Sequence, residues 1–375
     1  MNKPIIYIAT QTFPPDLGGI QSYMHAVATT LSHRHYTVKV YADALRGQST
    51  EAFDQQQPYQ IYRFGGLKPI RRRWKGFRLA KDVRPNTASN IILCDTWKSL
   101  EYLPDSLKER AKVLCLAHGM EFPDDSTPQK RERIKTTFAK ANRILANSHY
   151  TLDRLKPYLP DQKKGDILLP GIIPPALPSP TAKKQVQREL NERNPVLVTI
   201  SRIESRKGHD KVLHALPALI NDHPQLTYVI IGNGPDKPRL AGLVKELGLE
   251  EHVIFTGAVV DEEKNAWLSQ ADLFVMPSRA EGNSVEGFGL VYLEAAFFGV
   301  PSLAGQIGGA GDAVLHGETG LLCDSTSNTA VEKAIHQFLA NSTFRHTLGQ
   351  AAKIRVENDF LWPRAIDRLI HFFHC

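Results

Sequence analysis

Cysteine is scarce in this chain, and long hydrophobic runs are missing from it. The 375 residues contain four cysteines, Cys94, Cys115, Cys323 and Cys375, with no CxxC pair or other metal-type spacing. This usage excludes a disulfide-rich scaffold and a zinc finger, and it favours a reduced, cytoplasmic setting. No apolar run approaches the roughly 18 residues that a membrane-spanning helix needs. The opening MNKPIIYIAT predicts a β-strand and lacks the pattern of a signal peptide.

Acidic residues are outnumbered by basic ones. The chain has 39 Asp and Glu against 46 Lys and Arg, a formal net charge of +7. This balance favours anionic partners such as nucleotides, phospholipid surfaces or nucleic acid. Zinc-finger spacing and an aromatic RNA-binding signature are both absent, which argues against a nucleic-acid-binding protein. A basic nucleic-acid-binding protein is the non-enzyme alternative.

Short strand-like runs alternate with helical runs along most of the chain. Residues 5–10 predict a strand, and residues 19–34 predict a helix from their apolar spacing. The same alternation continues in both halves and predicts parallel sheets covered by helices on both faces. At roughly 100–200 residues per domain, the length predicts two domains.

A proline-rich segment separates the two halves. The stretch LLPGIIPPALPSPTAKK has five prolines, a density that is incompatible with a helix interior or a central strand. We predict a linker at 173–184 between an N-terminal domain, 1–172, and a C-terminal domain, 185–359. Each domain is predicted to be a Rossmann-like α/β unit.

Two carboxylates interrupt an apolar stretch, SVEGFGLVYLEAAFFGVPSLAG. Glu286 and Glu294 have seven residues between them, and Gly287 and Gly289 follow the first. A glycine-rich turn into a helix presents free N–H groups and the positive end of the helix dipole, which suits a phosphate. Glu294 is expected about two turns into the helix. The two carboxylates can then accept hydrogen bonds from sugar hydroxyls on either side of a pyrophosphate. The alternative for Glu294 is a pair with a core arginine.

Basic and glycine residues follow two neighbouring strands of the same half. Arg202 and Lys207 come after the strand PVLVTIS, at the edge where ligands bind in open α/β sheets. Two cations there suit a pyrophosphate, and a solvated basic loop is the alternative. Gly232 and Gly234 follow the strand LTYVII and permit close backbone approach. An ordinary strand-to-helix turn explains them equally well.

The N-terminal half repeats the arrangement of glycines before a helix. Gly18 and Gly19, in TFPPDLGGIQSY, precede the first predicted helix and could bind an anion. His118, in CLAHGMEF, ends another strand, where a histidine can be structural or catalytic. No DxD motif is evident, and PDD at 123–125 is a poor substitute for one.

These motifs together resemble a known family. EGFGLVYLE resembles the E-x7-E motif of the retaining glycosyltransferases of family 4, which have the GT-B fold of two Rossmann-like domains facing a central cleft. SRIESRKG, VIFTGAV, ADLFVMPS, GVPSLAG and GETGLL match the family pattern in order and spacing. The resemblance covers nearly the whole chain. Within the family, the likeness is to GDP-mannose-dependent mannosyltransferases that act on phosphatidylinositol mannosides.

The resemblance implies a role for each matching residue. Arg202 and Lys207 would bind the donor diphosphate, and Glu294 would bind the ribose hydroxyls. Glu286 and His118 would contact the transferred hexose. The catalytic set that it implies is His118, Arg202, Lys207 and Glu286, and the donor-binding set is Gly18, Gly19, Arg202, Lys207, Gly232, Val259, Glu286, Phe288, Gly289, Leu290 and Glu294.

The implied reaction moves a hexose from an NDP-sugar to a hydroxyl with retention of anomeric configuration. Mannose from GDP-mannose is the expected donor group, and a lipid-linked or glycan hydroxyl is the expected acceptor. No enzymic nucleophile is evident, so the leaving diphosphate would accept the acceptor's proton, and neither a metal nor a cofactor is expected. The alternatives are a UDP-sugar donor carrying glucose, galactose or N-acetylglucosamine, and a sugar-nucleotide 2-epimerase.

One segment remains outside these motifs. LKPIRRRWKGFRLAK, residues 67–81, holds seven basic residues, Trp74 and Phe77, and no acidic residue. It is either a solvated basic helix or a surface that rests on anionic lipid. The second interpretation implies a peripheral enzyme of envelope glycan synthesis at the inner face of the cytoplasmic membrane. The last residues, about 360–375, resemble the family's final helix, which packs back on the N-terminal domain.

Overall fold

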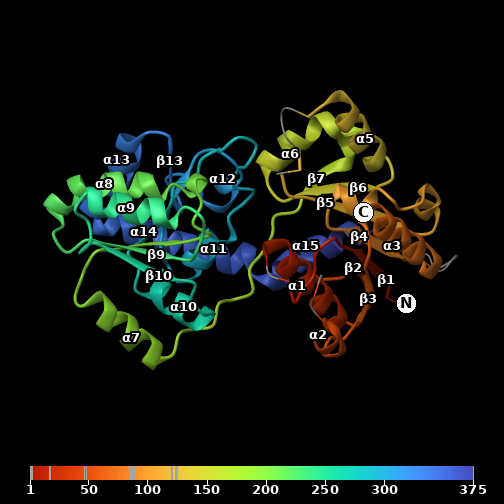
Figure 1. Cartoon of the computed structure of the whole chain (residues 1–375), viewed down its shortest axis with the longest axis horizontal. Helices are drawn as coiled ribbons and strands as arrows, with labels where there is room; N and C mark the ends of the chain where they lie inside the picture. The colour runs from red at the N-terminus through yellow and green to blue at the C-terminus, as the bar shows by residue number, and fades with distance from the viewer. Residues whose placement is uncertain are drawn as a thin grey trace. The chain divides into compact units, whose positions relative to one another are not determined.

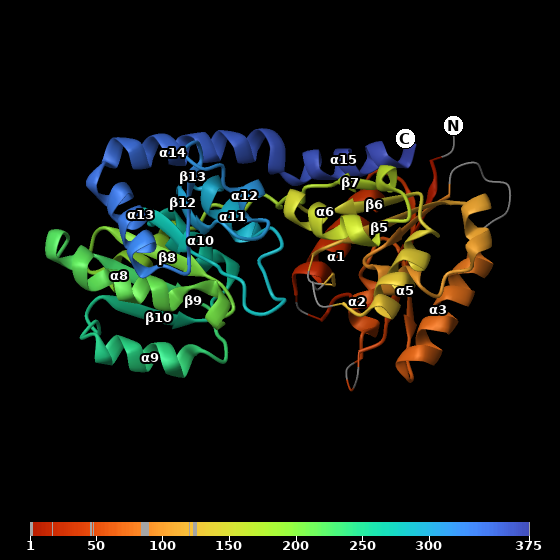
Figure 2. The same cartoon turned by 90° about the horizontal axis from the view of Figure 1, so that it is seen from above.

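The chain folds into two compact units, each built on one parallel sheet (Figures 1 and 2). The computed structural model describes residues 3–16, 18–45, 47, 49–83, 90–119, 121–122 and 126–374. Unit 1 comprises Met1–Leu168 and Ile366–Cys375, and unit 2 comprises Leu169–Ala365. Both units alternate strands with helices, which confirms the predicted class of two Rossmann-like α/β domains.

The sheet of unit 1 has seven strands in the order β3-β2-β1-β4-β5-β6-β7. Strand order reverses between the neighbours β1 and β4, and ligands bind outside the carboxyl ends of strands at such a switch point. The loops after β1, β4 and β5 therefore form the candidate site of this unit. The strands are β1 Ile5–Ala9, β2 Thr37–Asp43, β3 Gln60–Phe64, β4 Ile91–Cys94, β5 Lys112–Ala117, β6 Arg143–Ala146 and β7 Gly165–Ile167.

Helices cover both faces of this sheet because its strands are apolar on both sides. Tyr7 and Ala9 of β1 belong to a core cluster that includes Trp97 and Phe138, whereas the alternate residues Ile6 and Ile8 are buried facing the other way. At the end of the chain, Phe373 makes an edge contact with Tyr36. The helices are α1 Gly19–His33, α2 Glu51–Gln55, α3 Lys68–Asp82, α4 Trp97–Leu100, α5 Pro128–Phe138, α6 His149–Leu155 and α15 Trp362–His374.

The sheet of unit 2 has six strands in the order β10-β9-β8-β11-β12-β13, so its switch point lies between β8 and β11. Val198 of β8 packs into one core cluster and its neighbour Leu197 into the other. The strands are β8 Val196–Ile200, β9 Thr227–Ile231, β10 Val253–Gly257, β11 Leu273–Met276, β12 Ser302–Gly305 and β13 Gly320–Cys323. The helices are α7 Pro180–Leu190, α8 His209–Asp222, α9 Lys237–Glu246, α10 Asp261–Ser269, α11 Leu290–Phe297, α12 Ala310–Ala313, α13 Asn328–Ala340 and α14 Ser342–Arg355.

The proline-rich segment is irregular over a shorter length than its sequence predicts. Helix α7 begins at Pro180, so the prediction of a linker through Lys184 is wrong beyond Ser179. Ser179 caps the helix, because its side chain accepts a hydrogen bond from the N–H of Ala182 at 3.2 Å. Proline fits the first helical position, where its missing N–H would have had no partner.

Candidate functional site

A buried ion pair lies at the carboxyl end of β8 in unit 2. Lys207 ends a short 3-10 turn after β8, and its Nζ lies 2.5 Å from Oε2 of Glu286. The two side chains are only 11% and 14% exposed. Lys207 is therefore the partner that a buried Glu286 requires, and two residues predicted to bind the donor contact each other.

The same loop carries two further cations. Arg206 places a guanidinium nitrogen 3.5 Å from the same Glu286 oxygen, while its Nε lies 3.1 Å from Glu204. Arg202 also pairs with Glu204, at 3.2 Å, but its side chain is 71% exposed. The two predicted diphosphate ligands thus differ: Lys207 is buried and fixed, and Arg202 lies in solvent. Arg206 was missed, although its place beside Lys207 was the available signal.

The electrostatics of the cluster keep Glu286 ionised. Burial alone would raise the pKa of this carboxyl. The nearby positive charges of Lys207 and Arg206, together with the hydrogen bond from Lys207, outweigh burial and hold its pKa below the ordinary value. An ionised Glu286 can accept hydrogen bonds from ligand hydroxyl groups.

The turn between Glu286 and α11 requires glycine at its last position. Gly289 has a φ of 84°, and a Cβ there would lie 2.5 Å from the ring of Tyr292. The helix begins at Leu290, so Glu294 is its fifth residue and lies about one turn in. The expected two turns were wrong because residues 287–289 are not helical. The N-terminal N–H groups of α11 follow this turn directly.

Glu294 pairs with a lysine and not with a core arginine. Lys264 Nζ lies 3.0 Å from Oε2 of Glu294 and 3.0 Å from Oδ1 of Asp261. Burial lowers the pKa of Lys264, but the two carboxylates raise it further than burial lowers it. Sequence reasoning missed Lys264, which sits in the first turn of α10, four residues after Val260.

The other predicted donor residues of unit 2 occupy the same strand ends. A Cβ on Gly232 would lie 2.0 Å from the carbonyl oxygen of Ser201, so glycine lets the loops after β8 and β9 touch. Phe288 is 3% exposed and its ring packs against Phe360, leaving its backbone as the group available to a ligand. Val259 follows β10 and is half-buried. Their contacts with a donor stay predictions.

A buried polar chain supports the loop that carries the cations. His209, directly after Gly208, has its Nε2 3.0 Å from Oγ of Ser201 and its Nδ1 2.9 Å from the hydroxyl of Tyr228. The Tyr228 hydroxyl continues to Oγ1 of Thr199 at 2.8 Å. Burial lowers the pKa of His209 from 6.5 to about 4, so the ring is neutral near pH 7.

The lowered pKa of His209 predicts a loss of stability in mild acid. Between about pH 6.5 and pH 4 the unfolded chain binds a proton that the folded chain does not, so the free energy of unfolding falls as the pH drops. The pKa difference limits this contribution to about 3 kcal/mol. The free energy of unfolding of wild type minus that of His209→Gln should therefore be larger at pH 7 than at pH 4.5.

Urea unfolding at both pH values measures this difference. His214→Gln removes an exposed histidine from the same helix and serves as the matched control. An equal pH dependence in wild type, His209→Gln and His214→Gln would contradict the buried neutral state of His209.

In unit 1, the loop after β1 is fixed at its start and reaches α1 at the predicted glycines. Asp95 Oδ2 accepts hydrogen bonds from Thr10 Oγ1 and from the N–H of Gln11, both at 2.8 Å. Arg63 of β3 donates to the carbonyl of Pro14 at 2.5 Å. Gly18 and Gly19 lie where α1 begins, so their N–H groups belong to the positive end of that helix.

His118 lies at the carboxyl end of β5, one strand from the switch point. Its Nε2 is 2.9 Å from the carbonyl oxygen of Asp95, and its backbone N–H donates to Oε1 of Glu121 at 2.9 Å. The Asp95 contact requires a proton on Nε2, and in the neutral form of the ring Nδ1 is then the acceptor nitrogen. The half-buried ring is thus oriented by the end of β4.

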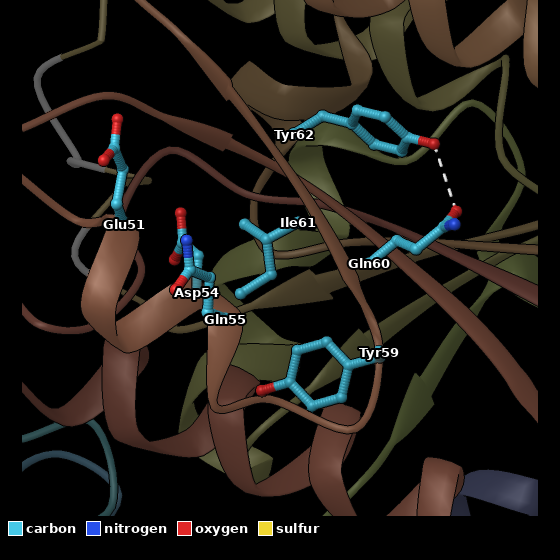
Figure 3. Close-up of a pocket in the computed structure, with 7 residues that line it drawn as sticks. All are labelled: Glu51, Asp54, Gln55, Tyr59, Gln60, Ile61 and Tyr62. Atoms are coloured by element: carbon cyan, nitrogen blue, oxygen red, sulfur yellow. Dashed lines mark hydrogen bonds between the residues drawn. The ribbon is translucent and has the colours of Figure 1, made fainter.

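A shallow hollow of about 370 Å³ in unit 1 contains none of the predicted residues (Figure 3). It lies between α2 and β3, and two of its lining residues are joined by a hydrogen bond from the Tyr62 hydroxyl to Gln60 at 3.1 Å. Asp54 is bound in two hydrogen bonds by Arg63. The hollow is lined by Glu51, Asp54, Gln55, Tyr59, Gln60, Ile61 and Tyr62.

Within the described ranges of the chain, no group of three or more His, Cys, Asp and Glu side chains could hold a metal ion. The PDD segment at 123–125 lies outside the described residues. Cys94, Cys115 and Cys323 are buried free thiols. None of the helices in the described part of the chain has the length and hydropathy to cross a membrane.

Comparison with known proteins assigns this architecture and these motifs to a family. Residues 17–174 match Glycosyltransferase Family 4, and residues 181–355 match Glycosyl transferases group 1. The chain is 30% identical over 364 residues to the GDP-mannose-dependent alpha-(1-6)-phosphatidylinositol monomannoside mannosyltransferase of Mycolicibacterium smegmatis, covering 95% of this chain and 94% of that protein. The monoacylated-substrate counterpart from Corynebacterium glutamicum is 26% identical and covers 96% of each.

Solved structures share the fold. Anabaena Alr3699/HepE in complex with UDP aligns with a TM-score of 0.80 at 19% identity, over 98% of this chain and 99% of that one. WaaG, a glycosyltransferase involved in lipopolysaccharide biosynthesis, aligns with a TM-score of 0.70 at 16% identity, over 99% of each chain. The sequence relationship over nearly the whole length and the shared GT-B fold show that this chain belongs to glycosyltransferase family 4 and is a hexosyltransferase.

Proposed function

We propose that the protein transfers mannose from GDP-mannose to a hydroxyl of a lipid-linked acceptor, with the anomeric configuration retained. The observation that carries the proposal is the cluster of Lys207, Arg206 and Glu286 at the switch point of unit 2, directly before the N-terminus of α11. Cations and a helix N-terminus suit a diphosphate, and Glu286 suits sugar hydroxyls. The names of the relatives add GDP-mannose and a phosphatidylinositol mannoside as the donor and acceptor classes.

Unit 2 would stabilise the departing diphosphate. As the glycosidic bond breaks, negative charge develops on the β-phosphate, and Lys207, Arg202 and the N–H groups of α11 lie ready to stabilise it. The diphosphate oxygen then accepts the proton of the attacking hydroxyl on the same face of the sugar, which retains configuration. In unit 1, Nδ1 of His118 would accept a hydrogen bond from a hexose hydroxyl.

Because fixed protein charges fill the role of a cation, turnover should survive removal of divalent metals. We expect 5 mM EDTA to leave the initial rate of transfer within about twofold of the untreated enzyme. The measurement is NDP release, with and without added Mg²⁺ after EDTA treatment. A rate that collapses and is restored by Mg²⁺ would contradict the metal-independent mechanism.

A thermal-shift screen tests the donor. A ligand that binds the folded state stabilises it by mass action, by about 2.7 kcal/mol at a concentration of 100 Kd. GDP-mannose should shift the melting temperature most, compared with UDP-glucose, UDP-galactose and UDP-N-acetylglucosamine at equal concentration. The UDP-sugars are the second candidate, because the solved HepE structures contain UDP and UDP-glucose. A larger shift with a UDP-sugar would overturn the choice of base.

We further propose that α3 rests on anionic lipid, which makes the enzyme peripheral at the inner face of the cytoplasmic membrane. Helix α3, labelled in Figure 2, carries different side chains on its exposed and buried sides. Leu67, Ile70, Trp74 and Phe77 form one stripe at helical spacing and are 55–73% exposed. An exposed stripe of large apolar side chains on a soluble unit is unusual. Aromatic and aliphatic side chains of this kind insert at the lipid interface.

The basic residues of α3 divide between its two sides. Lys75 is buried, with its Nζ 2.8 Å from Asp43 and 2.6 Å from the carbonyl of Thr10. Arg71 also pairs with Asp43, at 2.8 Å, and Arg72 donates to Gln11 at 2.8 Å. These three cations hold the helix to the ends of β1 and β2. The exposed basic residues that remain beside the apolar stripe are Lys68, Arg73, Arg78 and Lys81.

Charge reversal of the outer residues should release the protein from anionic vesicles. The triple variant Lys68→Glu, Arg73→Glu, Lys81→Glu is expected to weaken binding at least tenfold, since each cation near an anionic surface contributes about 1 kcal/mol. Co-sedimentation with phosphatidylcholine vesicles containing phosphatidylinositol, at low and high salt, measures the effect.

The matched control for this prediction lies in unit 2. The control is a triple variant that makes the same charge change on the exposed side of α7: Lys183→Glu, Lys184→Glu, Arg188→Glu. Its affinity for the vesicles should fall much less than that of the α3 variant. Wild-type protein that ignores anionic vesicles at low salt would contradict the membrane proposal and favour a soluble acceptor.

A further inference from the structure

The carboxylate of Glu286 is shared by two cations that hold it unequally. Lys207 Nζ lies 2.5 Å from Oε2, and a terminal nitrogen of Arg206 lies 3.5 Å from the same atom. That Arg206 nitrogen is buried and makes no hydrogen bond in the structure. A buried N–H group without a partner is costly. Arg206 therefore has an unpaired N–H group close to the Glu286 oxygen that already accepts a hydrogen bond from Lys207.

The proposed function gives Lys207 two partners. Its ammonium group donates a hydrogen bond to Glu286, and it would also have to bind the donor diphosphate. If Lys207 turned to the diphosphate and nothing replaced it, a carboxylate that is 14% exposed would lose its hydrogen-bonded cation. A buried carboxylate in that state either costs several kcal/mol or takes up a proton. A protonated Glu286 would then bind the hexose hydroxyls differently.

We infer that Arg206 is a positioning residue that takes over the Glu286 carboxylate when Lys207 turns to the donor diphosphate. The inference rests on the proposed function. The movement required is small, because shortening 3.5 Å to an ordinary hydrogen bond takes about 0.6 Å. Nε of Arg206 stays bound to Glu204 at 3.1 Å, and its carbonyl accepts from the N–H of Arg279 at 2.8 Å. The planar fork of arginine can hold both carboxylates at once.

The charges around Glu286 fit this exchange. The loop after β8 presents Lys207 and Arg206, and α11 presents the neutral phenol of Tyr292, whose pKa burial raises. Within the described residues, no other cation lies within ion-pair distance of Glu286. The loop after β8 also carries Arg202, so the three cations Arg202, Arg206 and Lys207 exceed the two carboxylates that they pair with, Glu204 and Glu286, by one charge. That surplus is available to the diphosphate.

Proton linkage on nucleotide binding distinguishes this role from a structural one. Calorimetric titration with GDP at pH 7, in two buffers of different ionisation enthalpy, counts the protons that are taken up. Wild type should take up none through Glu286. Arg206→Met should take up as much as one proton and bind GDP about tenfold or more weakly, because Glu286 must be protonated when Lys207 leaves it. Arg206→Lys restores a cation and should reduce both effects.

Combining Arg206→Met with Glu286→Gln tests whether the Glu286 carboxylate is the group that takes up the proton. The amide of Glu286→Gln needs no counter-ion, so adding Arg206→Met to it should change neither proton uptake nor GDP affinity. Arg193→Met, which removes an arginine paired with Glu251 at 3.7 Å elsewhere in unit 2, is the matched control and should behave as wild type. If Arg206→Met does not fold, Arg206→Gln, alone and combined with Glu286→Gln, gives the same comparison.

The outcomes separate the two proposals. An Arg206 variant that binds GDP with wild-type affinity and no proton uptake overturns the exchange and leaves the proposed function standing. An affinity loss that persists in the Glu286→Gln background also overturns it, because it shows a structural role. Wild-type protein that binds neither GDP nor UDP overturns the proposed function and the exchange together.

Discussion

Replacing Lys207 with methionine is expected to lower kcat by about 100-fold or more. Removing one group that stabilises charge developing in a buried site typically costs 10²–10³ in rate, or about 2.7–4 kcal/mol. Lys207 is such a group, because its side chain is 11% exposed and lies beside the N-terminus of α11. Steady-state kinetics at saturating donor measures the loss.

Arg202→Met is the informative comparison. Its guanidinium is 71% exposed, so water screens its charge and its loss should lower kcat by about tenfold only. Thermal unfolding must accompany both assays, since Lys207→Met leaves Glu286 with Arg206 alone. Near-wild-type turnover of a folded Lys207→Met protein would contradict the diphosphate assignment, and a larger loss in Arg202→Met would reverse the ranking of the two cations.

Replacing His118 with alanine is expected to lower transfer by at least tenfold while GDP affinity stays within a few-fold of wild type. The ring lies at the end of β5, held by the Asp95 carbonyl at 2.9 Å, and its proposed contact is with the hexose. The nucleotide is assigned to groups of unit 2, so GDP alone should not detect the change. Calorimetry with GDP and a transfer assay with GDP-mannose, run on the same preparation, separate the two effects.

His118→Asn is the control for this prediction, because it keeps a hydrogen-bonding side chain and should retain more transfer than alanine. Collapse of GDP affinity in His118→Ala would show that His118 is structural or faces the nucleotide. Its proposed role would then be wrong.

Motif residues were predictable because short-range sequence spacing fixes them. Strand ends place Arg202 and Lys207 at the sheet edge, and the glycines before α11 place Glu286 at its N-terminus. Their mutual contact was not predictable, because the residues are 79 positions apart and come together only through the pairing of β8 with β11. Lys264 was missed for the same reason, since its partner Glu294 comes from another helix.

Residues 67–81 have a helical periodicity that their high basic charge obscures. Within this basic segment, the spacing of Leu67, Ile70, Trp74 and Phe77 marks an apolar stripe, and Arg71 and Lys75 lie four residues apart on the other side. The structure shows Lys75 buried and the stripe exposed. Whether such a stripe faces a core or solvent depends on the tertiary fold and cannot be inferred from spacing.

Short edge elements were also missed. Strand β3, QIYRF, mixes polar with apolar residues, and β13, GLLC, is only four residues long; both lie at the edges of their sheets. Their pairing is set by the neighbouring strand more than by their own sequence. The buried chain of Thr199, Tyr228 and His209 likewise depends on contacts between β8, β9 and α8.

The most direct test of the account is the structure of the product formed from GDP-α-mannose and a phosphatidylinositol mannoside acceptor in anionic vesicles. Proton and carbon NMR of the purified glycolipid reports both the sugar and the configuration at its new linkage. The account predicts one added mannose in α-linkage, with GDP released in equal amount. A β-linked product, an epimerised free nucleotide sugar, or transfer from a UDP-sugar but not from GDP-mannose would contradict it.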